Sequence, residues 1–477
     1  MRHRLRWDLL LAVVVAAAFA VRCLLLMDAT GLWSDELYSV GKSFQASPAA
    51  LIAMLREDTH PPAYYALLWI WGQVVGQSPI TLRLFSWLAY LAGGLVMVAQ
   101  SRALGGQRVV PLALLLAFCS PFPVRFAIEG KSYALLVLVV ALAWWWRRAE
   151  RPLLYGCAVA FASLTHFYGL FLFLAAAFWD GWKQRWSMAF AAGLAVLPSL
   201  GWIAFASSYL LSSRSGSWIG RPDFALLEDT LARGIGVWPI PKLLLLAVLL
   251  VLLRRWGSQR SQSWSDPDLL DRSGLIPSAV MTGAVVLVSF FKPLAFSRYF
   301  VVLLPALLPW LVVQSLDWSL DRRGRWLVNA ALIVLLISWW GPGFAELDPV
   351  VSGVRSGVRE QDHFRAVSQR AAGLEERYSP RARLLNLSDR MEWSMGRLEQ
   401  PVGSWQGPRL LRARLEDTTP PAELWLASSG PERAMQKKLR PLEEMVEQAG
   451  YTCAEEASDL SHARLLHCQS GSRAPER

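Results

Sequence analysis

The sequence lacks the short motifs with which soluble enzymes bind nucleotides or activate a nucleophile. It contains no GxxxxGK[ST] phosphate loop, no GxGxxG turn between a strand and a helix, no HExxH zinc motif and no GxSxG turn. A binding site for ATP or for a soluble nucleotide sugar is therefore not indicated. The sequence also contains no internal repeat and no low-complexity tract.

Cysteine is scarce, with 5 residues in a chain of 477. Cys23, Cys119 and Cys157 fall within apolar runs, whereas Cys453 and Cys468 stand alone in a polar C-terminal part. An isolated pair in a domain outside the cytoplasm can form a disulfide, and two free buried thiols are the usual alternative. The sequence leaves both open.

A small-x-small cleavage site is also absent after the N-terminal apolar run. That run is longer than the apolar core of a signal peptide, so we expect it to be retained as a membrane anchor.

Apolar residues are abundant: 54% of the chain is hydrophobic, the mean hydropathy is +0.31, and there are 24 tryptophans. Most of the first 340 residues are apolar runs separated by charged clusters, which is typical of serial membrane helices. The net charge of +11 could suggest a nucleic-acid partner. However, the basic residues lie in short clusters between the runs, as the positive-inside rule predicts. These clusters are Arg2/Arg4/Arg6, Arg102/Arg108, Arg147/Arg148/Arg151, Lys183/Arg185, Arg254/Arg255/Arg260 and Arg322/Arg323/Arg325.

The pattern predicts about 11 membrane spans with the N-terminus in the cytoplasm. We expect them near residues 8–27, 80–100, 109–124, 132–147, 152–166, 168–181, 187–206, 238–253, 275–291, 299–316 and 326–341. The apolar segment 61–77 opens with two prolines and is too short to span, so it is predicted to be an interfacial or re-entrant helix. The segment 47–57, with Ser47 as N-cap and Pro48 at the first helical position, predicts a second helix along the membrane surface.

From about residue 342 the composition becomes polar and no further span follows. We therefore expect two domains: a membrane domain over 1–341, with a long outer loop at 28–79, and a soluble extracytoplasmic domain over 342–477. An amphipathic helix is predicted at 359–375, and short apolar runs at 382–387, 423–427 and 464–468 predict strands. Alternating helices and strands indicate a small α/β domain.

Asp35 and Glu36 follow the first span directly, inside the aromatic frame of Trp33 and Tyr38. Two carboxylates are costly to place at a bilayer edge. One carboxylate near a low-dielectric interface could act as a general base on an acceptor hydroxyl while the other orients it or binds a cation. The alternative is an ordinary solvated pair in a loop.

Further polar residues are predicted at the same outer face. His60 precedes Pro61-Pro62 at the start of a helix, where the helix amides attract anions. Lys131 could neutralise a phosphate or pair with Glu129, and Arg298 opens a span against the positive-inside trend, which favours bidentate phosphate binding. The turn holding His166 and Tyr168 places another imidazole at this depth. In each case an interfacial structural role is the alternative.

At these residues the chain resembles the GT-C superfamily of polytopic glycosyltransferases, in the family that groups protein O-mannosyltransferases with bacterial aminoarabinose transferases. The resemblance covers about residues 1–340 and is carried by ordered motifs: Trp33-Ser34-Asp35-Glu36 with Tyr38, His60-Pro61-Pro62 with Tyr64-Tyr65, Arg83, Glu129 with Tyr133, His166-Phe167-Tyr168, and Arg298-Tyr299.

The resemblance implies a bacterial plasma-membrane enzyme that takes a sugar from a polyprenyl phosphate and transfers it, with inversion, to a lipid, glycan or protein acceptor. By analogy Asp35 is the base and Glu36 assists. Lys131, Arg298, Tyr299 and His60 would bind the donor phosphate. Glu129, Tyr133, His166, Tyr168 and Tyr65 would bind substrate. Lys131 departs from the family, since arginine is usual there and lysine loses the bidentate fork.

Some members of this superfamily use a divalent metal, for which Asp35, Glu36, His60 and His166 could supply ligands. Two other functions also fit a chain of this kind. A transporter or flippase of an anionic glycolipid would need many spans and cationic groups, although its ionisable residues should lie near the membrane midplane of two related halves. A catalytically inactive scaffold that binds partners through its tail is the other.

Overall fold

The structure is a computed structural model and divides into two compact units. Unit 1 comprises Met1–Met27 and Gln45–Leu347, and unit 2 comprises Asp28–Phe44 and Asp348–Arg477. The predicted boundary between 341 and 342, the predicted span 238–253 and the predicted helix 359–375 lie outside the described residues. The structure describes residues 2–25, 27, 34–121, 126–211, 219–235, 267–316, 322–340, 383–386, 411–412, 415–416, 418, 420, 423–429, 432–455 and 463–471.

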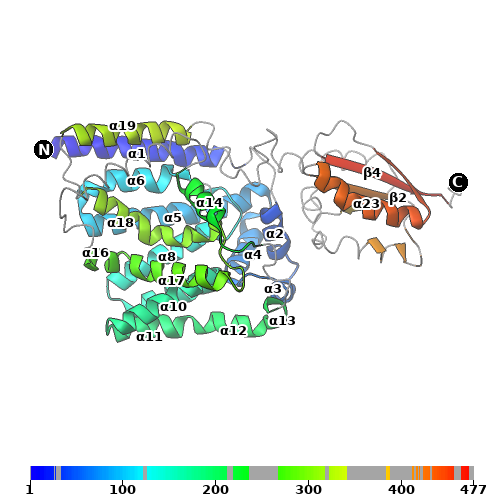
Figure 1. Cartoon of the computed structure of the whole chain (residues 1–477), viewed down its shortest axis with the longest axis horizontal. Coiled ribbons are helices and arrows are strands. Elements are labelled where there is room, and N and C mark those ends of the chain that lie inside the picture. Colours follow the sequence, from blue (N-terminus) through cyan, green and yellow to red (C-terminus); the bar gives the residue numbers. More distant parts are fainter. Residues whose placement is uncertain are drawn as a thin grey trace. The chain divides into compact units, whose positions relative to one another are not determined.

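Unit 1 is a bundle of apolar helices (Figure 1). Within the described residues, 4 helical stretches are long and apolar enough to cross a membrane. They lie in α1 (Arg2–Leu25), in α5 (Pro79–Gly105), across α11 (Trp186–Ala195) and α12 (Leu197–Phe205), and across η3 (Ser297–Leu303) and α18 (Leu304–Leu316). Large apolar side chains on these helices point outward; Leu25 and Leu194, for example, are 76% and 65% exposed. Such faces need a lipid solvent, so the chain is an integral membrane protein.

Shorter helices complete the bundle where the apolar runs predicted spans. They are α6 (Val110–Cys119), α8 (Tyr133–Arg148), α9 (Pro152–Thr165), α10 (Phe167–Trp182), α17 (Leu275–Ser289) and α19 (Arg322–Trp340). The first and last helices of the bundle run side by side (Figure 1), with the Phe19 ring edge-on to Trp340 at 5.0 Å. Small residues allow close packing elsewhere: a Cβ at Gly93 of α5 would lie only 3.0 Å from the backbone of Leu138 in α8.

Both helices predicted for the first outer loop are present. α3 (Pro48–Arg56) begins as predicted: the Ser47 hydroxyl accepts a hydrogen bond from the Ala50 amide at 3.2 Å, and Pro48 occupies the first turn. α4 (Ala63–Val75) follows the two prolines and has 13 residues. At 1.5 Å per residue it is about 20 Å long, which is too short for the hydrocarbon core.

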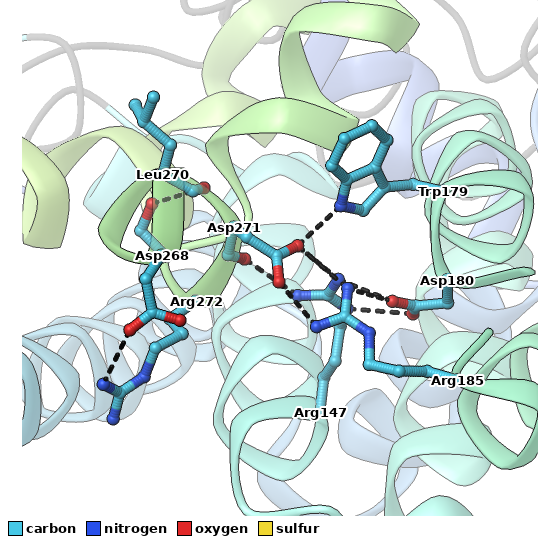
Figure 2. A network of polar contacts seen from close by, with 9 residues as sticks. Arg147, Trp179, Asp180, Arg185, Asp268, Leu270, Asp271 and Arg272 are labelled. Carbon is cyan, nitrogen blue, oxygen red and sulfur yellow. Dashed lines mark hydrogen bonds and ion pairs between the residues drawn. The ribbon is translucent and has the colours of Figure 1, made fainter. Parts of the chain in front are cut away.

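At the C-terminal ends of α8 and α10, a buried ion network joins these two helices to α16 (Pro267–Arg272), as Figure 2 shows. Arg147 donates to both Asp180 oxygens, at 2.9 and 2.6 Å, and Arg185 donates to both Asp271 oxygens, at 2.5 and 2.9 Å. Arg147 also donates to the backbone oxygen of Asp271, and the Trp179 indole donates to its carboxylate. Opposite charges at these helix ends therefore hold three separate segments together.

The C-terminal part of unit 2 contains a four-stranded sheet in the order β1-β2-β4-β3. The strands are β1 (Arg383–Asn386), β2 (Glu423–Ser429), β3 (Tyr451–Glu455) and β4 (Ala463–Ser470). β1 is parallel to β2, and the other pairs are antiparallel. Apolar side chains of α23 (Glu432–Gln448), among them Leu439 and Val446, form a core with Leu424 and Leu466 of the sheet. This confirms a small sheet with a covering helix in the tail.

Cys453 and Cys468 form a disulfide. They are directly paired residues on the neighbouring strands β3 and β4. Of the two alternatives left open by the sequence, the bonded pair is therefore the one present.

Candidate active site

His166 forms the turn between α9 and α10. Its backbone is extended, and its Nδ1 atom accepts a hydrogen bond from the Tyr168 amide at 3.1 Å, which caps the N-terminus of α10. Gly169 makes the tight turn feasible, because a Cβ there would lie 2.4 Å from the Ala162 carbonyl oxygen. Burial, together with the charges of His60 and Lys131, lowers the pKa of His166 to about 3. The imidazole is therefore neutral at physiological pH.

Three tyrosines surround this imidazole. The centroid of the His166 ring lies 6.0 Å from Tyr133, 5.7 Å from Tyr168 and 4.9 Å from Tyr299. Tyr133 opens α8 and Tyr168 lies in the first turn of α10, while Tyr299 belongs to η3. The Tyr168 hydroxyl donates to the Leu294 carbonyl at 2.8 Å. Segments far apart in the sequence therefore meet through their aromatic rings at one end of the bundle.

Three buried charged side chains come from the segments around these rings. Glu129, Lys131 and Arg298 are each buried. The Arg298 Nη1 atom lies 3.9 Å from Glu129 Oε1, and its guanidinium lies over the Phe296 ring at 5.1 Å. The Lys131 amide donates to the Glu129 carbonyl at 2.7 Å, which gives the two residues a tight turn just before α8. Two cations thus accompany one carboxylate in a place with little water.

His60 approaches from the loop between α3 and α4. Its ring centroid lies 6.1 Å from that of His166 and 6.0 Å from that of Tyr65. Its Nδ1 atom lies 3.2 Å from the Asp58 carboxylate and 3.0 Å from the Thr59 hydroxyl. Asp58 was not predicted from the sequence, although a carboxylate two residues before a histidine was a signal that could have found it.

The structure thus brings together nine of the predicted site residues, all in unit 1. They are His60, Tyr65, Glu129, Lys131, Tyr133, His166, Tyr168, Arg298 and Tyr299. Cations, imidazoles and phenols gathered in a buried place suit an anion such as a phosphate.

Another residue of the resemblance has a structural contact. The guanidinium of buried Arg83, on α5, donates to the backbone carbonyl of Met27, just after α1. This bond ties the two helices together at this end.

Ser297 and Asp229 were not predicted as site residues from the sequence. The Ser297 hydroxyl, next to Arg298, donates to the Asp229 carboxylate of α14 (Phe224–Ile235). No motif marks Asp229, because α14 was not predicted as a helix and its contact with η3 joins distant parts of the chain.

Asp35 and Glu36 lie in the first turn of α2 (Ser34–Ser43), which belongs to unit 2. Acidic side chains in a first turn are favoured by the helix dipole. Glu36 is buried and Asp35 is half-buried, and the Ser39 hydroxyl donates to the Asp35 carbonyl at 3.1 Å. The role of this pair as base and helper stays a prediction.

The predicted metal ligands gain no support in the described part of the chain. No group of three or more His, Cys, Asp or Glu side chains there is arranged to hold a metal ion. The Nδ1 atom of His166 caps α10, and the Nδ1 atom of His60 faces Asp58. Both Nδ1 atoms therefore have partners within the protein.

The fold matches solved structures over the whole chain. The ArnT protein from Cupriavidus metallidurans in its apo state superposes with a TM-score of 0.61 at 13% identity, covering 98% of this chain and 99% of that one. The same protein bound to undecaprenyl phosphate gives 0.60 at 14% identity, with the same coverage. No model of a known protein family matches the sequence, and neither does any curated protein. The chain therefore shares the overall fold of these two structures.

Proposed function

We propose that this protein is a membrane glycosyltransferase that transfers a sugar from a polyprenyl phosphate to a lipid, glycan or protein acceptor on the outer face of the membrane. The main support for this proposal is the full-length match to a protein solved with undecaprenyl phosphate, together with the buried cluster around Lys131 and Arg298. A lipid-linked sugar donor presents a phosphate at the membrane surface, and such a cluster could bind it.

The reaction needs one base, a stabilised leaving group and exclusion of competing water. The Asp35 carboxylate takes the proton of the acceptor hydroxyl, and Glu36 assists. The acceptor oxygen then bonds to the anomeric carbon from the face opposite the phosphate. The bond from that carbon to the phosphate oxygen breaks, and its electron pair leaves with the polyprenyl phosphate. The configuration at the carbon is therefore inverted.

The cations have the matching task in this scheme. Negative charge grows on the phosphate as the sugar leaves, so Arg298, Lys131 and His60 stabilise the transition state more than the ground state. Tyr299 would donate to the phosphate, while Tyr133, His166, Tyr168 and Tyr65 would contact the substrate. His166 would contribute shape and hydrogen bonding.

We place the cluster at the outer face of the plasma membrane. α8 begins at Tyr133 within the cluster and ends at Arg148, and α10 runs from the same cluster toward Lys183 and Arg185. The basic clusters therefore lie at the ends of the helices away from the site, and the positive-inside rule assigns those ends to the cytoplasm. With about 11 spans, the N-terminus lies in the cytoplasm and the C-terminal domain outside.

The experiment compares cells that lack the gene with cells that carry the wild-type, Asp35→Asn or Glu57→Gln chain at equal membrane levels. Glu57 is an exposed acid of the same outer loop and controls for the loss of one charge. Glycolipids and surface glycans are compared by mass spectrometry. We expect deletion and Asp35→Asn to lose the same sugar mass, because removing a general base slows transfer about 10²- to 10⁴-fold. If Asp35→Asn restores the product as well as wild type does, Asp35 is not the base, and the result favours the transporter or scaffold function.

A further inference from the structure

Glu129 was predicted to touch the substrate, yet its carboxylate faces a cation of the protein itself. Glu129 Oε1 lies 3.9 Å from Arg298 Nη1, and both side chains are buried. At this distance the groups form an ion pair without a direct hydrogen bond between these two atoms. A buried charge is stable only with a compensating partner, so each of the two residues stabilises the ionised state of the other.

Other contacts orient Arg298 besides this carboxylate. The Phe296 ring lies under the guanidinium at 5.1 Å. The neighbouring Ser297 is bonded to Asp229 of α14, and the ring of Tyr299 is packed against His166 and Tyr168 at 4.9 and 5.1 Å. The backbone of η3 is therefore fixed on both sides of Arg298. We expect the guanidinium to keep its place when the carboxylate of Glu129 is removed.

A guanidinium prefers a bidentate partner with two parallel N–H···O bonds, and a phosphate offers one. The distance of 3.9 Å between Glu129 Oε1 and Arg298 Nη1 is longer than either bond of such a pair. A lipid phosphate that reaches Arg298 would therefore gain a better geometry than the carboxylate has. It would also be repelled by the carboxylate, because both groups are negative.

We propose that Glu129 is an internal counter-ion of Arg298, which neutralises the arginine in the empty site and is displaced from it by the donor phosphate. Glu129 is thus a positioning residue that lowers the affinity for polyprenyl phosphate and favours its release after the sugar has left. The identity of the phosphate rests on the proposed function, whereas the pairing of the two charges does not.

The first test measures binding of undecaprenyl phosphate, which carries no sugar, to the full-length protein in detergent. Glu129→Gln removes the charge and keeps the shape, so we expect affinity to rise about tenfold or more. A residue that contacts only the sugar would leave this affinity unchanged, and a residue needed to build the phosphate site would weaken it. Either result overturns the proposal. Glu228→Gln, an exposed acid on α14, removes the same charge and is expected to change binding less than twofold.

The second test does not depend on the lipid. In phosphate-free buffer, Glu129→Gln leaves a buried arginine without this counter-ion, so the melting temperature of the variant is expected to be lower than that of wild type. Inorganic phosphate is expected to raise the melting temperature of the variant more than it raises the melting temperature of wild type. Arg298→Gln should also destabilise, and the double variant Glu129→Gln/Arg298→Gln should be more stable than either single variant. The pairing would be contradicted if the double variant were no more stable than the less stable of the two single variants, even if one single variant fails to fold.

The two tests distinguish an incorrect donor from an incorrect pairing of Glu129 with Arg298. If wild type binds undecaprenyl phosphate no better than undecaprenol, the proposed donor is wrong. The double variant and the phosphate rescue then still decide whether Glu129 serves as the counter-ion of Arg298.

Discussion

At the residue scale, the two histidines of the site have opposite surroundings although their rings are only 6.1 Å apart. His60 has the Asp58 carboxylate 3.2 Å from its Nδ1 atom. His166 is buried, receives a backbone N–H at Nδ1 and lies near positive charge, all of which favour the neutral ring. His60 therefore has a carboxylate as its partner, whereas His166 caps the start of α10.

This neutral state makes the stability of the protein depend on pH. The folded-state pKa of His166 is about 3, below the ordinary value of 6.5. The unfolded chain therefore binds more protons between these two values, and stability is complete above about pH 6.5 and lost as the pH falls toward 3. His166→Asn keeps a capping acceptor and does not titrate. Between pH 7.5 and pH 5 we expect wild type to lose about 2 kcal/mol more unfolding free energy than this variant.

The measurement is denaturant unfolding of the purified protein in mild detergent at both pH values, followed by tryptophan fluorescence. His166→Ala removes the cap as well and is expected to be less stable than His166→Asn by about 1 kcal/mol at pH 7.5. Equal pH dependence of wild type and His166→Asn would show that folding does not lower the pKa of His166.

The sequence could predict which residues belong to the site better than what each one contacts. The motifs around His60, Glu129, His166 and Arg298 were visible because they break apolar runs at the same membrane face. Their contacts depend on how distant segments pack, and one sequence contains no record of that. The pairing of Glu129 with Arg298 and the bond from Ser297 to Asp229 are therefore findings of the structure alone.

At the scale of elements, the ion network at the far ends of the helices fixes the positions of three segments. Arg147 closes α8, Asp180 lies in the last turn of α10, and Asp271 lies in the short α16 (Figure 2). α16 has only 6 residues, too few to be stable on its own. Its place therefore depends on the bonds of Asp271 to Arg147, Arg185 and Trp179.

The loss of one carboxylate from this network should be measurable. Burial alone would raise the pKa of Asp271, but the hydrogen bond from Arg185 and the charge of Arg147 outweigh it and hold the pKa well below its ordinary value of 3.8. The stabilisation is therefore present above about pH 4 and is lost as the pH falls below that value. We expect Asp271→Asn to lower stability by about 3 kcal/mol at pH 7, and by less at pH 3.

The measurement is thermal unfolding of Asp271→Asn, and Asp268→Asn on the same helix is the matched control. Asp268 pairs with Arg272 at 3.2 Å but its side chain is 71% exposed, so its loss should change stability by less than about 0.5 kcal/mol. Equal effects of the two substitutions would mean that the network does not stabilise the helix ends.

Most elements of unit 1 could be predicted because each apolar run is nearly continuous and is bounded by charges. The break between α11 and α12 was not predicted, although Pro198 follows it directly. In the tail, β3 has only 5 residues and α23 contains Pro441 among many charges, so neither gave a clear signal. These elements become stable through their contacts with β2 and β4, which local sequence does not encode.

At the scale of the whole molecule, the compartment of the tail and the orientation of the bundle are one question. An odd number of spans puts the two ends of the chain on opposite sides of the membrane. The cytoplasm keeps thiols reduced, whereas disulfides form and persist outside it. The bond between Cys453 and Cys468 therefore agrees with a tail on the outer side, the same side to which the charge pattern assigns the site.

This agreement can be tested with a chain in which Cys23, Cys119 and Cys157 are replaced by serine or alanine, so that only the pair in the tail remains. Cells are quenched with acid, and the protein is denatured and treated with a maleimide coupled to a large polymer. We expect no gel shift without reductant and two added polymers after reduction. Cys453→Ser in this background must take one polymer without reductant, which shows that the reagent reaches the tail. Two polymers on the unreduced pair would place the tail in a reducing compartment and, with it, invert the proposed orientation of the site.

The bond closes a short loop, with a sequence separation of 15. The double Cys453→Ser/Cys468→Ser chain should therefore lose about 3 kcal/mol of tail stability.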